Sequence, residues 1–165
     1  VGVDDFAQRS IGKLAKIELP KVGSVVRQGE TMVTMTHGNK SLSTAAPVSG
    51  TIVQVNTRVK DSPWIVNDSP LEKGWIARIA PQDLAVELHN LFKGVVADRW
   101  QEAVRAHLVH WLSPHIGAVM QDGGDIVDNV SDLVNDQEWH LLVDEFFPKD
   151  LNDTHYNNTE KGFLL

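Results

Sequence analysis

Hydrophobic and polar positions alternate along the first half of the chain, with the period of two that is typical of half-buried β-strands. The alternation is clearest over residues 14–19. Further short strands are expected at 32–36, 51–55 and 75–79, with proline and glycine turn signals between them. Many short strands bounded by turns favour a small sandwich or barrel over residues 1–80.

A hairpin turn is predicted at His37-Gly38-Asn39-Lys40, directly after the second expected strand. Glycine at the first central position suits a type II′ turn, which matches the twist of the strands on either side. We expect His37 and Gly38 to be exposed turn residues.

The hydrophobic period becomes helical after Pro81. An apolar face predicts a first helix between Asp83 and Gly94, and a second helix is expected over 97–112, ended by Pro114. Residues 116–130 have the pattern of a strand, a turn and a second strand. The last helix is expected to start at Asn135, because Asn135 and Glu138 have the spacing of a capping box.

These patterns divide the chain into a β module (1–80), an α-rich extension with one hairpin (81–148) and a flexible polar tail (149–165). The expected fold class is therefore α+β. The length of 165 residues is enough to bury a sizeable core.

Composition removes several classes of function. The chain has no cysteine, which excludes disulfides, thiolate metal sites and a cysteine nucleophile. The net charge of −7 argues against nucleic acid as the main partner. No apolar run approaches the roughly 18 residues of a membrane span, and we expect a cytoplasmic protein. Residues 121–150 hold nine acidic side chains against one basic, which is either a solvated surface or a docking face for a basic partner.

No set of side chains assembles into a catalytic or metal centre. The nucleophile elbow, the P-loop and the dinucleotide fingerprint are absent. His107, His110 and His115 lie close in sequence, but no carboxylate completes a known zinc pattern, and the aspartates over 122–132 lack the spacing of a calcium loop. We expect neither an enzyme nor a metal protein.

Five short motifs in the β module resemble those of the glycine cleavage system H protein family. VGVDDFAQ at 1–8 is similar to the family's V-G-I-T-D-Y-A-Q, and ELPKVG at 18–23 to its E-L-P-E-V-G. APVSG at 46–50 matches the family's A-P-V-S-G, and the SP, VN, SP and GW pairs over 62–75 resemble its N-P-x-L-V-N-x-x-P and G-W stretch. All five motifs occur in the family's order and at nearly its spacing, so the resemblance is specific over residues 1 to about 83. The resemblance is that of a divergent paralogue of the family.

The resemblance implies a lipoyl/biotinyl-type β barrel-sandwich, here followed by a C-terminal helical extension. It also implies a non-enzymatic carrier, whose lipoyl arm is attached to one lysine at a hairpin tip. An ungapped alignment over 29–50 puts Asn39 at the lysine position, with Lys40 one residue late and Thr36 in place of a glutamate. The family's first two strands have no counterpart, so we expect a sandwich that lacks them.

Lipoylation needs a primary amine, which Asn39 does not have, and a shift of one residue turns a strand side chain to the opposite face. We therefore expect a scaffold without cofactor that binds partner proteins, such as other subunits of a multi-enzyme or redox complex. The alternative is a true lipoyl carrier modified on Lys40, with lipoate as its cofactor. The orientation of Lys40 at the hairpin tip distinguishes the two.

Overall fold

Two small antiparallel sheets form the centre of the protein. The computed structural model describes residues 1–116 and 129–147. The first sheet has the order β1-β3-β4, with β1 at Lys16–Glu18, β3 at Thr31–His37 and β4 at Lys40–Ala45. The second has the order β2-β5-β6, with β2 at Val25–Val26, β5 at Gly50–Val55 and β6 at Ala77–Pro81.

The strands expected within residues 1–80 are thus confirmed, with β6 starting two residues later than predicted. The fold is an α+β sandwich, as expected, but in the described residues each sheet is open and neither closes into a barrel.

The core lies on the inner faces of the two sheets. In the first sheet Ile17 pairs with Met35, and Met35 pairs with Leu42, so the three side chains form one row across the strands. Their exposed fractions are 3%, 0% and 1%. Ile52 of β5 is also fully buried. The alternating pattern therefore points its apolar set inward, as a period of two requires.

Three short helices lie inside the segment that the sequence predicted as wholly β. They are α1 (Asp5–Ile11), α2 (Arg58–Asp61) and α3 (Ile65–Asp68). Asp4 caps α1, since its side chain accepts a 2.9 Å hydrogen bond from the amide of Ala7. The helices have only seven, four and four residues, so an apolar period is too short to stand out in the sequence.

The first expected helix of the extension is broken. Helix α4 ends at Glu87 (Leu84–Glu87), and a 3-10 turn follows at Leu88–Asn90. Helix α5 spans Val95–Ile116 and continues past Pro114, contrary to the prediction. Pro114 stands in the last turn, so the helix loses only the bond to the carbonyl of His110.

Two further helices close the described chain. They are α6 (Val130–Leu133) and α7 (Asp136–Phe146), and the capping box of Asn135 and Glu138 is present as predicted. The hairpin expected over 116–130 falls largely outside the described residues, and its two end residues belong to α5 and α6. The tail expected over 149–165 lies outside them entirely.

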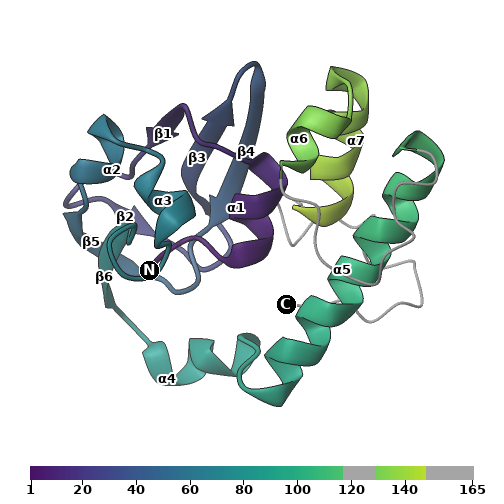
Figure 1. The fold of residues 1–165 in the computed structure, drawn as a ribbon. Coiled ribbons are helices and arrows are strands. Elements are labelled where there is room, and N and C mark those ends of the chain that lie inside the picture. The colour runs from purple at the N-terminus through teal and green to yellow at the C-terminus, as the bar shows by residue number, and fades with distance from the viewer. Residues whose placement is uncertain (117–128, 148–165) are drawn as a thin grey trace.

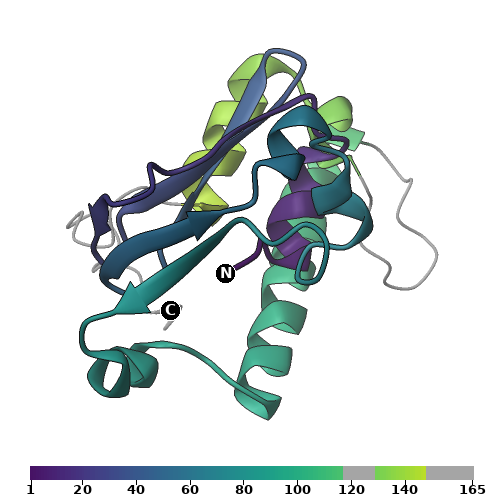
Figure 2. The same ribbon diagram turned by 90° about the vertical axis from the view of Figure 1, so that its left-hand side faces the viewer.

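The two ribbon views place α6 and α7 beside the β3–β4 hairpin, with α5 running along the outer side of the molecule (Figure 1, Figure 2). Helix α4 extends from the end of β6, away from the hairpin tip (Figure 1). The fold therefore brings the end of the described chain against the segment in which the family resemblance places the lipoyl lysine.

Candidate functional site at the β3–β4 hairpin

The hairpin tip is a two-residue turn made of Gly38 and Asn39, closed by the paired residues His37 and Lys40. Gly38 has a φ of +57°, and Asn39 has no positive φ, which is the combination that a type II′ turn needs. Both turn residues are exposed, whereas His37 and Lys40 are half-buried. The predicted turn is confirmed, but His37 is not a freely exposed turn residue.

The amine of Lys40 does not extend into solvent. Its Nζ donates hydrogen bonds to the backbone carbonyls of Ser131 and Val134. These carbonyls belong to α6 and to the residue that ends it, where helical carbonyls lack intrahelical partners. Lys40 therefore fixes the end of α6 to the hairpin.

Asn39 stands at the apex of the turn. Its Nδ2 donates a 2.6 Å hydrogen bond to Oδ2 of Asp136, at the start of α7. A carboxamide nitrogen is not nucleophilic, so Asn39 cannot form the amide that a lipoyl lysine forms. The residue at the tip is thus held by α7 and chemically unreactive toward lipoate.

His37 connects the same hairpin to α6. Its Nε2 lies 2.9 Å from Oδ1 of Asp132, and its Nδ1 lies 2.5 Å from the carbonyl oxygen of Lys13. The pKa of His37 is raised, first by the hydrogen bond to the Lys13 carbonyl and then by Asp132. Partial burial of the ring and the nearby charge of Lys40 lower the pKa of His37, but not enough to offset the rise that these two contacts cause.

Helices α6 and α7 form what we call the tip cover, residues 130–146. Trp139 of α7 is 2% exposed, and its Nε1 donates a 3.0 Å hydrogen bond to the carbonyl of Ser41 on β4. In α6 the hydroxyl of Ser131 donates a 2.7 Å bond to the carbonyl of Ile11. Buried apolar packing and polar contacts together hold the tip cover against both the hairpin and α1.

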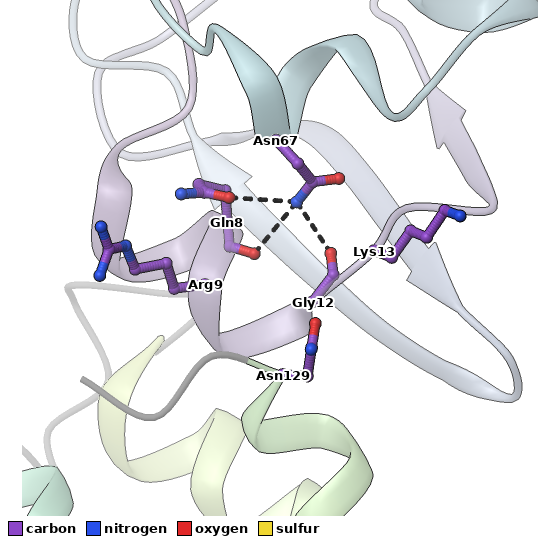
Figure 3. Close-up of a pocket in the computed structure, with 6 residues that line it drawn as sticks. All are labelled: Gln8, Arg9, Gly12, Lys13, Asn67 and Asn129. Atoms are coloured by element: carbon purple, nitrogen blue, oxygen red, sulfur yellow. Dashed lines mark hydrogen bonds between the residues drawn. The ribbon is translucent and has the colours of Figure 1, made fainter. Parts of the chain in front are cut away.

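A second polar feature lies where α1, α3 and the start of α6 meet, around a pocket of about 300 Å³. Figure 3 shows Asn67 facing Gln8 and Gly12. Its Nδ2 donates to three oxygen atoms: the carbonyl of Gly12 at 2.9 Å, Oε1 of Gln8 at 3.1 Å and the carbonyl of Gln8 at 3.4 Å. Its Oδ1 accepts from the amide of Leu14. Because its amide is fully used, we assign Asn67 the role of joining α1 to α3.

The sequence did not identify this junction, although Asn67 lies in the VN motif. Gly12 has a φ of +79°, and a Cβ there would lie 2.5 Å from Oδ1 of Asn129. Only glycine therefore allows the chain before α6 to approach the end of α1 this closely.

His107, one of the three histidines that were weighed as metal ligands, packs against α7. His107 lies 3.4 Å from Glu145, and its ring packs 4.9 Å from that of Phe146. Over residues 1–116 and 129–147 no group of three histidine, aspartate or glutamate side chains is placed to hold a metal ion. The aspartates at 122, 125 and 128 fall outside this range, and Asp132 contacts His37. In the same ranges no helix is long and apolar enough to cross a membrane.

Comparison with known proteins agrees with the motifs. The model of the family "Glycine cleavage H-protein" matches residues 1–103. The glycine cleavage system H protein of Hydrogenovibrio crunogenus is 40% identical over 95 residues, which cover 58% of this chain and 73% of that protein. The probable glycine cleavage system H protein of Pyrococcus furiosus is 42% identical over 91 residues, which cover 55% and 67%.

A solved structure is also similar in part. The glycine cleavage system H protein of Mycobacterium marinum shares 32% identity, with a TM-score of 0.47, over 49% of this chain and 64% of that one. The matched region thus spans less than two thirds of that protein. The family match, in contrast, covers more than half of this chain, including the sandwich and the hairpin. The chain therefore belongs to the glycine cleavage H-protein family.

Proposed function

We propose that this chain is a non-lipoylated member of its family, a non-catalytic scaffold that binds partner proteins such as other subunits of a multi-enzyme or redox complex. The observation that carries the proposal is the lack of an available amine at the hairpin tip. Asn39, which aligns with the family's lipoyl lysine, has no amine, and the amine of Lys40 is bound to two carbonyls of the tip cover.

A surface suited to a protein partner lies on residues 84–96, which we call the arm. Its large apolar side chains are exposed, with Val86 at 61% and Val95 at 65%. The arm is nevertheless fixed in place, because Oε2 of Glu87 accepts a 2.7 Å bond from the amide of Ser49. Exposed apolar side chains gathered on a fixed segment are typical of interaction sites, which supports partner binding.

The second candidate function is a lipoyl carrier modified on Lys40. It is favoured by membership of the family and by a primary amine next to the turn. For a ligase to use this amine, Lys40 would have to leave the carbonyls of Ser131 and Val134, and the hairpin would have to present a side chain one residue away from the aligned position.

The intact mass of the protein separates the two functions. The wild type, Lys40→Ala and Asn39→Lys are produced in a host with active lipoate synthase and ligase, and a lipoylated H protein is produced there as the control. We expect the wild type and Lys40→Ala to be unmodified. Asn39→Lys restores a lysine at the aligned, exposed position, and we expect it to gain one lipoyl group if the hairpin is still recognised.

A wild-type mass raised by one lipoyl group, and lost in Lys40→Ala, would overturn the proposal and establish the carrier. If only Asn39→Lys is modified, the missing amine at position 39 explains the lack of lipoylation. If no variant is modified while the control protein is, the ligase does not recognise this hairpin even with a lysine at position 39, and the scaffold proposal stands.

A further inference from the structure

Both ring nitrogens of His37 face oxygen atoms that can only accept hydrogen bonds. One is the carbonyl oxygen of Lys13, 2.5 Å from Nδ1, and the other is Oδ1 of Asp132, 2.9 Å from Nε2. A neutral imidazole carries a single N–H and can donate to one of them, whereas an imidazolium donates to both. A neutral ring keeps its one N–H in the shorter contact, with the Lys13 carbonyl in the loop before β1. The bond to Asp132, which links the hairpin to α6, therefore forms only in the protonated state.

The charged groups around His37 come from each element packed on the hairpin. Asp132 of α6 favours the imidazolium, and Lys40 of β4, held at the end of α6, disfavours it. From the loop before β1, Lys13 contributes its backbone carbonyl. From α7, Asp136 is bonded to Asn39. The raised pKa of His37 shows that the carbonyl and Asp132 prevail.

We propose that protonation of His37 fastens the hairpin tip to α6, and that its deprotonation loosens this contact locally. The tip cover as a whole stays in place, because Trp139 and Leu142 are 2% and 0% exposed and their packing does not depend on the histidine. The device is thus a pH-dependent latch on residues 37–40, and not a lid that swings away.

The direction follows from the sign of the pKa shift. A group whose pKa is higher in the folded, latched state stabilises that state fully below its ordinary pKa of about 6.5. This stabilisation is lost as the pH rises through the raised value. The latch is therefore closed in mildly acidic conditions and loosens as the pH increases. This latch rests on the proposed function, because it would regulate the access of partner proteins to the hairpin tip.

Nuclear magnetic resonance on the unmodified protein tests the latch. The ring nitrogens of His37 are titrated in the wild type and in Asp132→Asn, which removes the carboxylate but keeps its size. We expect the midpoint of His37 to fall in Asp132→Asn and to stay unchanged in Asp144→Asn. Asp144 is exposed and on α7, so it is a matched control.

Amide hydrogen exchange gives a second, independent readout. The amide of Asp132 donates to the carbonyl of Asn129, and we expect its protection to fall as the pH passes the midpoint of His37. Protection of this amide is expected to fall by about tenfold for each unit by which the pKa of His37 in the latched state exceeds its pKa in the released state. In His37→Gln the protection is expected to lose this pH dependence, whereas His140→Gln, an exposed change on α7, keeps it.

The latch is refuted if the His37 midpoint is the same in the wild type and Asp132→Asn. It is equally refuted if protection changes with pH in His37→Gln as it does in the wild type. Should His37→Gln not fold, the titration of Asp132→Asn decides alone. Neither readout depends on lipoylation, so a failure here leaves the mass test of the proposed function unaffected.

Discussion

Replacing Trp139 with alanine tests whether the tip cover is an integral part of the fold. The indole is 2% exposed and packed between α7 and the edge of the first sheet. Truncating a buried aromatic side chain to alanine costs about 3–5 kcal/mol, from lost burial and the cavity left behind. The bond from Nε1 to the carbonyl of Ser41 is lost as well, which adds about 1 kcal/mol.

The loss is measured by urea unfolding followed by circular dichroism, since the substitution also removes a fluorophore. With a slope of about 2 kcal/mol per molar, the unfolding midpoint of Trp139→Ala is expected to fall by about 2–3 M. Trp64→Ala is the control, because this indole is 49% exposed, and its expected loss is below about 1 kcal/mol. Equal losses in the two variants, or a loss below about 1 kcal/mol in Trp139→Ala, would show that α7 does not pack on β4.

Two further predictions concern the junction between α1, α3 and α6. Gly12→Ala is expected to lose about 1–3 kcal/mol more stability than Gly23→Ala, because both glycines have positive φ but only Gly12 has a neighbour, Oδ1 of Asn129, in the way. Thermal melts of the two variants give this difference, and equal melting temperatures would contradict the close approach. Asn67→Ala is expected to lose about 1–3 kcal/mol through unsatisfied partners in Leu14 and Gly12. Asn67→Asp is expected to lower stability at least as much as Asn67→Ala, because its carboxylate would face the three oxygen atoms that accept hydrogen bonds from Asn67. An Asn67→Asp variant more stable than Asn67→Ala would contradict these hydrogen bonds.

Local patterns predicted those elements whose cause is local. The alternation over 14–19 and 51–55 specifies strands because it needs only the period of two. The capping box at Asn135 was readable because both partners lie three residues apart. Helices α1 to α3 were missed since each is only one or two turns long and embedded in a region of strand and turn signals.

The apolar face expected between Asp83 and Gly94 shows a different limit. Periodicity predicted an apolar helical face here, and in the structure Leu84 and Leu88 on this face are 42% and 44% exposed. A hydrophobic pattern indicates which side of an element is apolar. It does not indicate whether residues of the same chain or a partner protein pack against that side. The exposed arm is thus consistent with a scaffold that meets another protein.

For the site, the sequence by itself determined which residues stand at the hairpin tip: a glycine that allows the turn, Asn39 without an amine, and Lys40 one position late. Only the tertiary structure decided what these residues do. The carbonyls that bind Lys40 lie 91 and 94 residues further along the chain, and Asp132 lies 95 residues from His37. A pattern of neighbours cannot encode such contacts, because they exist only once apolar burial has packed Trp139 and Leu142 beside the hairpin.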